Sequence, residues 1–240
     1  MATYKTCGII LKRMNLGEAD RILTIYTQDH GKIKTIAKGV RKPLSKLAGN
    51  LELFCLDKFL IAKGRNLDTI AEVENIKCYF PLRGNLLATH SAYYLAEIVD
   101  KMTPEHQPHP KIFELLEQVL EYLSSKNTQL LIPYFEINFL AEAGLKPELY
   151  ECLACGKKTL LENNYFSFSS GGLVCGKCQA NDQKISNQAI KVLRLLLKNK
   201  ASIVYKISLD EKTQKEVIKL TSDYINYLHQ KEFNSQRFIK

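Results

Sequence analysis

The chain has 240 residues, 45% of them hydrophobic, and carries a formal net charge of +9. A chain of this length can bury a sizeable core and is expected to form more than one domain. No stretch approaches the roughly 18 uninterrupted apolar residues of a membrane helix. The N-terminus MATYKTCGIILKR also lacks the apolar segment and cleavage site of a signal peptide. We therefore expect a cytoplasmic protein with no membrane partner.

The excess of positive charge is concentrated near the N-terminus. Residues 1–80 contain 14 Lys/Arg against 8 Asp/Glu, and residues 31–50 contain six basic residues and no acidic one. A surface that carries only positive charge attracts polyanions, among which nucleic acid is the foremost candidate. The alternative is a solvated lysine-rich loop that only keeps the protein soluble.

The first 80 residues have the pattern of short strands. Runs rich in Ile, Thr, Tyr and Phe are separated by turns that contain Gly or Asn. Five strands in about 75 residues indicate a small closed barrel, for which the five-stranded OB-fold is the leading interpretation. An SH3-like barrel has a similar strand count and remains an alternative interpretation. The predicted strands are residues 5–13, 20–28, 31–38, 51–62 and 68–77.

Lysines and apolar residues alternate in the third predicted strand. Successive side chains point to opposite faces of a strand, so the lysines share a face that meets solvent or a ligand. A turn built on Gly39 and Pro43 follows and presents further basic residues. We expect the main patch that contacts nucleic acid to consist of Lys32, Lys34, Lys38, Arg41, Lys42 and Lys46.

Base stacking is a second requirement of many single-strand-binding surfaces. The basic loop 38–46 contains no aromatic residue. Stacking on the barrel would then depend on Tyr26, Phe54 or Phe59. These side chains can equally belong to the barrel core, and the sequence leaves the choice open.

After Pro81 the pattern becomes helical. Asn85 is the expected N-cap of a helix whose apolar residues recur at helical spacing as far as Met102. The proline-rich loop 103–110 ends this helix, and a second one follows. A third helix runs from about residue 129 and stops at Gly144, a common C-terminal residue.

Two more helices are expected near the C-terminus, one after Ser186 and one after Asp210. Their apolar stripes are typical of a helix-bundle core. The chain is therefore predicted to be an α+β protein. We expect an OB-fold domain at 1–80, the first part of a helical domain at 81–149, a zinc module at 150–180, and helices at 181–240 that pack on the helical domain.

Two CxxC pairs lie between the helical segments. Nineteen residues separate the pairs, inside the window of about 15 to 20 that is typical of a four-cysteine zinc site. One tight turn directs both sulfurs of a pair at the same ion, and the second pair completes a closed tetrahedron. Such a site stabilises a fold and leaves no position for catalysis. We expect one structural Zn²⁺ per chain, bound by Cys152, Cys155, Cys175 and Cys178.

Redox chemistry is the alternative for these pairs, either as a reactive dithiol or as two disulfides. The other cysteines, Cys7, Cys55 and Cys78, lie among apolar residues and are interpreted as small core side chains. Seven cysteines cannot form a complete disulfide framework. We therefore expect them to be reduced.

No motif makes a positive case for catalysis. The sequence contains no GxSxG, no GxGxxG after a strand and no HExxH. The GxxxxGK match at 171–177 is followed by Cys178, where a phosphate-binding loop needs Ser or Thr for magnesium. Glu18 and Asp20 fall in a predicted turn, where acidic residues are common turn formers. The sequence favours a binding protein over an enzyme.

Several segments carry a family resemblance in a fixed order along the chain. They are GIILK at 8–12, GEADRIL at 17–23, TQDHGKI at 27–33, AKGVRK at 37–42, FEINFL at 135–140, GLKP at 144–147, GGLVC at 171–175 and NSQR at 234–237. Together with the two CxxC pairs, they resemble the bacterial recombination mediator family RecO. The resemblance spans the whole chain and rests on the order and spacing of the segments.

The resemblance implies an N-terminal OB-fold, a helical domain and a zinc module whose cysteines vary among members. It also implies binding to single- and double-stranded DNA, annealing of complementary strands, and help to RecA in displacing single-stranded-DNA-binding protein, usually with RecR. The family docks the acidic, apolar C-terminal tail of single-stranded-DNA-binding protein. The implied location is the bacterial cytoplasm, in association with the nucleoid.

Two other classes of protein fit a basic barrel with a zinc module. One is a zinc-stabilised RNA-binding factor of ribosome or tRNA maturation. The other is a nucleic-acid-modifying enzyme whose site has no familiar motif. Relative affinity for single-stranded DNA and matched RNA, followed by annealing and cleavage assays, separates the three.

Overall fold

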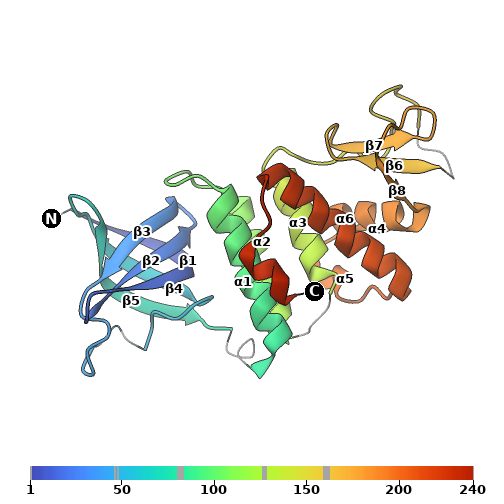
Figure 1. The fold of residues 1–240 in the computed structure, drawn as a ribbon. Helices are drawn as coiled ribbons and strands as arrows, with labels where there is room; N and C mark the ends of the chain where they lie inside the picture. The colour runs from blue at the N-terminus through green and yellow to red at the C-terminus, as the bar shows by residue number, and fades with distance from the viewer. Residues whose placement is uncertain are drawn as a thin grey trace. The chain divides into compact units, whose positions relative to one another are not determined.

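The computed structural model describes residues 2–45, 47, 49–79, 84–125, 129–158 and 163–239 (Figure 1). The contacts within the chain define two compact units. The first consists of Met1–Ser125 and Phe233–Lys240, and the second of Lys126–Glu232. The first two helices thus group with the barrel, and the four-part division made from the sequence remains a prediction. No helix in the described part of the chain is both long and apolar enough to cross a membrane.

Five strands of the first unit close into a barrel in the order β1-β2-β3-β5-β4 (Figure 1). β1 pairs with both β2 and β4 in antiparallel fashion, and β3 meets β5 in parallel. This closure removes free strand edges and confirms the predicted OB-fold. The strands are β1 (Thr3–Leu16), β2 (Asp20–Thr27), β3 (Gly31–Ala37), β4 (Leu56–Ala62) and β5 (Asp68–Lys77).

The interior of the barrel is filled by apolar side chains from all five strands. The period of two seen in the sequence sends alternate residues inward. The buried core consists of Ile10, Leu23, Ile25, Ile33, Ala37, Val40, Leu51, Phe59, Ile61 and Ile70. No side chain of this core is available to a ligand on the outside of the barrel.

The three barrel aromatics considered for base stacking are all buried. Tyr26 and Phe59 are 0% exposed and Phe54 is 6% exposed. Tyr26 lies beside Phe113, with the two ring centroids 6.3 Å apart. These rings stabilise the fold through packing, and the sequence could not decide this because an aromatic residue fits a barrel core and a barrel surface equally well.

Two helices and a short C-terminal segment complete the first unit. They are α1 (Leu86–Met102), α2 (Pro110–Ser125) and the 3₁₀ helix η2 (Asn234–Phe238). Asn85 caps α1 as predicted, since its side chain accepts a hydrogen bond of 3.1 Å from the Ala88 N–H. The Glu97 carboxylate of α1 accepts hydrogen bonds from the backbone N–H groups of Asn234 and Ser235. The end of the chain is thereby fastened to α1.

The second unit combines helices with a small sheet of order β7-β6-β8. Ser186 and Asp210 cap their helices as expected, accepting hydrogen bonds from the N–H groups of Ala189 and Thr213. α3 is buried on nearly all sides and packs against α4 and α6. The elements are α3 (Leu131–Glu142), β6 (Asn164–Ser167), β7 (Gly172–Cys175), β8 (Gln183–Ile185), α4 (Asn187–Lys198), α5 (Ala201–Val204) and α6 (Glu211–His229).

One cysteine pair departs from the prediction of free core thiols. Cys55 and Cys78 form a disulfide, with their Cα atoms 4.3 Å apart. Cys55 precedes β4 and Cys78 follows β5, and the antiparallel pairing of Leu56 with Lys77 brings them together. The prediction of free thiols at these two positions is wrong because strand pairing sets their proximity. Cys7 is free, as expected.

Candidate metal centre and nucleic-acid interface

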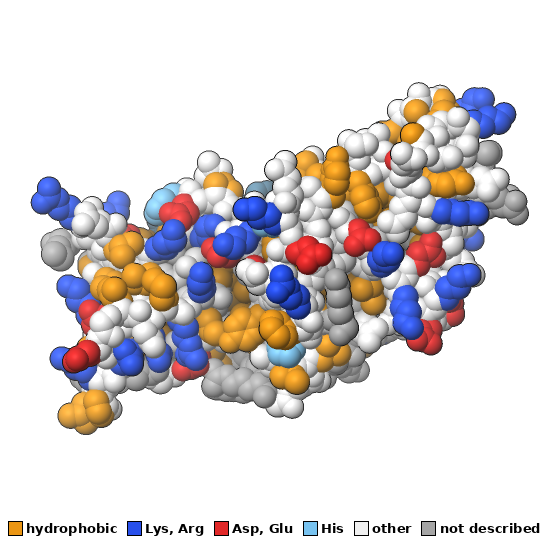
Figure 2. Space-filling model, in the orientation of Figure 1, with side chains coloured by type: hydrophobic (Ala, Val, Ile, Leu, Met, Phe, Trp, Pro, Cys, Tyr) orange, Lys and Arg blue, Asp and Glu red, His pale blue; other side chains and the backbone are white. Residues whose placement is uncertain are grey.

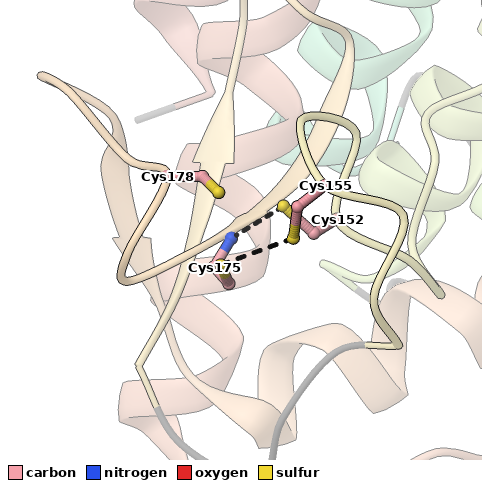
Figure 3. Close-up of side chains that lie close together, drawn as sticks. All are labelled: Cys152, Cys155, Cys175 and Cys178. Atoms are coloured by element: carbon pink, nitrogen blue, oxygen red, sulfur yellow. Dashed lines mark hydrogen bonds between the residues drawn. The ribbon is translucent and has the colours of Figure 1, made fainter.

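The four cysteines of the CxxC pairs converge on one point (Figure 3). Their sulfur atoms all lie within 4.8 Å of one another, and all four thiols are free. Cys152 and Cys155 belong to a turn that precedes the sheet, Cys175 ends β7, and Cys178 lies in the turn that follows. The 4.0 Å between the sulfurs of Cys155 and Cys175 is close to the roughly 3.8 Å expected around a tetrahedral ion with metal–sulfur bonds of about 2.3 Å.

Backbone N–H groups stabilise negative charge on the sulfurs of Cys152 and Cys175. The Cys175 N–H donates to Cys152 Sγ at 3.3 Å. Burial opposes ionisation of Cys152, but N–H groups of Cys175, Cys155 and Ala154 outweigh it and lower the pKa of that thiol to about 6. Hydrogen bonds from Lys177 N–H and the Cys178 thiol lower the pKa of Cys175 as well.

The fourth sulfur behaves differently because its neighbours are also thiols. Interactions with Cys175 and Cys155 raise the pKa of Cys178 to about 12. Four thiolates in so small a volume repel one another unless a cation lies between them. The cluster therefore has the donor set and the spacing to hold a metal ion, and sulfur-only sites suit soft or borderline ions such as zinc.

The core around the cluster is small. It consists of Cys152, Val174 and Cys175, against which the partly buried Tyr165 and Cys178 pack. So few apolar side chains give little hydrophobic stabilisation. Ligand bonds to a metal would supply what this core lacks.

The six residues predicted to contact DNA differ in their exposure and in their ion pairs. Lys38, Arg41 and Lys42 are exposed in the loop after β3. Lys34 is exposed on β3, but its ammonium lies 2.5 Å from Glu105, which also raises the pKa of Lys34. Lys46 lies outside the described residues. The positive charge accessible to a ligand is thus greatest in the loop.

Lys32 departs from the prediction that it meets solvent or a ligand. It is 6% exposed, and its ammonium donates to the backbone carbonyls of Asp100 and Thr103 at the C-terminal end of α1. Those carbonyls have no partner within the helix, and the helix dipole makes this end negative. The alternation in β3 is as expected, but the loop after α1 covers its outward face at Lys32, where His106 N–H donates to Lys32 O.

The backbone of the basic loop is fastened to the turn between β1 and β2. Asp20 Oδ1 accepts a hydrogen bond of 2.7 Å from the Gly39 N–H, and Ala19 O accepts one of 2.9 Å from the Arg41 N–H. The Arg41 guanidinium also donates to Gly17 O. Asp20 therefore holds the loop in place, a role that nothing in the sequence signals, because the partner lies 19 residues further on.

These features define a class of protein: an OB-fold barrel with an exposed basic loop, joined to a unit that carries a four-cysteine cluster able to hold a metal ion. Two family models match the chain over almost its whole length. "Recombination protein O N terminal" covers residues 1–79, and "Recombination protein O C terminal" covers residues 83–237. The chain belongs to the RecO family of DNA repair proteins, in agreement with the resemblance seen in the sequence.

Individual relatives support the same assignment. The chain is 38% identical to the DNA repair protein RecO of Dehalococcoides mccartyi over 233 residues, which cover 95% of this chain and 92% of the relative. It is 33% identical to that of Acetivibrio thermocellus over 245 aligned positions, covering 100% and 97% of the two chains. For Roseiflexus sp. the identity is 32%, with 98% and 84% covered.

Proposed function

We propose that this chain is a recombination mediator that binds single- and double-stranded DNA and anneals complementary strands. The observation that carries the proposal is the exposed basic loop of Lys38, Arg41 and Lys42, held on a rigid barrel by Asp20 and Ala19. Cations fixed on a scaffold reduce the repulsion between two phosphate backbones and release counterions when DNA binds. Annealing needs no catalytic group, and we propose that the protein is not an enzyme.

Membership of the RecO family supports a wider role in repair. In this role the protein assists the loading of RecA on DNA coated by single-stranded-DNA-binding protein, together with RecR. It would recognise the acidic, apolar C-terminal tail of single-stranded-DNA-binding protein through positive charge beside an apolar surface. Such binding weakens with salt, because the ion pairs involved are exposed and screened.

The four-cysteine cluster is proposed to hold one Zn²⁺ per chain. The sulfur-only donor set and the separations of the sulfurs support this ion. A site closed by four protein ligands leaves no coordination position for substrate. The zinc would supply folding free energy to residues 150–180 and would take no part in chemistry.

The test is annealing of complementary oligonucleotides, each coated with the cognate single-stranded-DNA-binding protein. The protein should accelerate duplex formation without added nucleotide, and the acceleration should fall steeply as salt rises. An equal or greater affinity for matched single-stranded RNA would favour an RNA-binding role. Failure to anneal coated strands at low salt would refute the mediator function.

A further inference from the structure

A cavity of about 660 Å³ lies between the barrel and the helices of the first unit. Its walls come from β1, α1 and η2, and its volume falls within the range of sites that hold small organic groups. On the face shown in Figure 2, hydrophobic side chains gather beside a histidine, with Lys and Arg around them. The lining includes Leu11, Lys12, Arg13, Tyr93, Lys101 and Phe238.

An irregularity of β1 shapes one wall of this cavity. The pairing of β1 with β2 shifts between Ile10 and Lys12, as in a β-bulge, which changes the direction of side chains. Leu11 lines the cavity but is only 4% exposed, whereas Lys12 and Arg13 are exposed at its mouth. Arg13 also pairs with Glu52 at 2.8 Å. Lys12 and Arg13 both line the mouth of the cavity.

The acidic groups that line the cavity are engaged by the protein itself. The Glu97 carboxylate accepts hydrogen bonds from Asn234 N–H and from the N–H and hydroxyl of Ser235. The Asp100 carboxylate lies 3.6 Å from the ammonium of Lys32. Glu97 keeps its negative charge because its donors are neutral, and Arg13 is paired with Glu52. The positive charge left for an anionic ligand is that of Lys12 and Lys101.

Two aromatic rings face this positive mouth. Among the described residues of the first unit, the exposed aromatic side chains are Tyr93 at 43% and Phe238 at 61%. Each is supported by another ring: Phe54 lies 5.0 Å from Tyr93, and His90 lies 5.2 Å from Phe238 between ring centroids. Exposed aromatic rings beside phosphate-binding cations are what single-stranded nucleic acid requires.

The exposed end of β1 connects this cavity with the basic loop. Met14 and Leu16 are 54% and 41% exposed, and Gly17 O binds the Arg41 guanidinium. A strand rises about 3.3 Å per residue, so the path from Arg13 to Gly17 is roughly 13 Å long. A few nucleotides can bridge the two sites.

We propose that the cavity receives unstacked bases of single-stranded DNA, which stack on Tyr93 and Phe238 while Lys12 and Lys101 contact the adjoining phosphates. The strand continues along β1 to the loop of Lys38, Arg41 and Lys42. This inference rests on the proposed function and adds a base-binding site to it. Duplex DNA keeps its bases stacked, so the cavity discriminates single strands from duplexes.

The test uses the full-length protein and oligonucleotides that carry the fluorescent base 2-aminopurine at successive positions. Stacking on a ring changes the emission of this base, so positions that enter the cavity stand out. The Tyr93→Ala/Phe238→Ala double variant should bind single strands at least about 30-fold more weakly, since each stacked base contributes roughly fivefold or more, and should lose the position-specific change. Its affinity for duplex DNA should stay within about twofold of wild type, since paired bases do not enter.

Tyr227→Ala is the matched control, because Tyr227 is an aromatic residue of the second unit with a similar exposure of 49%. Phe238→Leu keeps the apolar bulk of the side chain and removes only the ring, so it tests stacking if the double variant does not fold. Thermal unfolding shows whether each variant folds. Unchanged single-strand affinity in the double variant, with wild-type binding intact, overturns the site but leaves the proposed function standing. No binding of single strands by the wild type at low salt overturns both. A double variant that loses an acidic apolar peptide while keeping DNA assigns the cavity to a protein partner and also overturns the site.

Discussion

The ammonium of Lys32 on β3 lies 3.6 Å from the Asp100 carboxylate near the end of α1. The same ammonium donates to the carbonyls of Asp100 and Thr103. The loop that follows α1 passes so close to β3 that a Cβ on Gly31 would lie 2.2 Å from Gln107 O. A lysine in a basic segment thus joins the barrel to the helices and contributes to folding.

Replacement of Lys32 by Met should reduce stability rather than DNA binding. The variant leaves two carbonyls and a carboxylate without their charged donor, which costs about 2 kcal/mol. Urea unfolding measures the difference, and the salt dependence of DNA affinity should change little. Lys34→Met is the matched control on the same strand: its ion pair with Glu105 is exposed, so the loss of stability should be much smaller. Equal stabilities of the two variants would contradict this role for Lys32.

Replacement of Lys38, Arg41 and Lys42 by Ala should weaken DNA binding in a salt-dependent way. Each lost phosphate contact lowers the slope of log affinity against log salt by roughly 0.7 for single strands. The triple variant should therefore lose about two units of slope, and its annealing rate should fall, while its unfolding midpoint stays close to that of wild type. Binding titrations at several salt concentrations measure the slope.

A triple variant with the same change of charge provides the control. Lys5, Lys58 and Lys63 are exposed on the β1–β4 side of the same barrel. Their replacement by Ala should change the slope by much less, because these residues lie outside the proposed path. If both triple variants lose the same slope, only net charge matters. If neither does, the loop is a solubilising surface.

Replacement of Cys175 by Ser should release the metal from the second unit. The backbone N–H of Cys175 also donates to the sulfur of Cys152, and the core around the cluster is small, so metal–sulfur bonds should supply much of the folding free energy there. Zinc content should fall from one per chain to near zero, and amide exchange should rise across this segment. Cys7→Ser is the control and should keep the metal. Wild-type protein with four freely reactive thiols in this cluster and substoichiometric zinc would contradict the site.

Asp57 should make stability decline as pH rises toward neutrality. Burial raises the pKa of this carboxyl to about 7, although a hydrogen bond from Asn75 opposes the shift. In the unfolded chain the group titrates near about 3.9, so between these values the folded state binds the extra proton. The contribution of this group to the free energy of unfolding is complete below about pH 4 and is lost as pH rises through about 7.

The Asp57→Asn variant removes that proton linkage while it keeps a polar side chain of the same shape. Its stability relative to wild type should improve by roughly 2 to 4 kcal/mol between pH 4 and pH 7.5. Unfolding by urea at several pH values gives the difference. Parallel curves for the two proteins would show that Asp57 does not titrate in this range.

Much of the fold could be read from local patterns in the sequence. Alternation along the strands predicts which side chains of β3 point inward, since the period of two belongs to the strand itself. Asn85, Ser186 and Asp210 mark helix starts because each cap bonds to an N–H group three residues away. The cysteine cluster is predictable for a similar reason. Each CxxC pair is a local turn, so only one contact between distant segments, that between the two turns, is needed to complete the cluster.

The remaining features depend on segments that are distant in the chain. In the sequence Lys32 resembles any surface lysine, and only the contact with the end of α1 and the loop after it buries this residue. Cys55 meets Cys78 only because β4 pairs with β5. The ring of Phe238 reaches His90 across 148 residues. Sequence patterns report which face of an element is apolar, because burial follows hydrophobicity. Which polar or aromatic side chain remains exposed is decided by what packs against it, and only the tertiary structure contains that information.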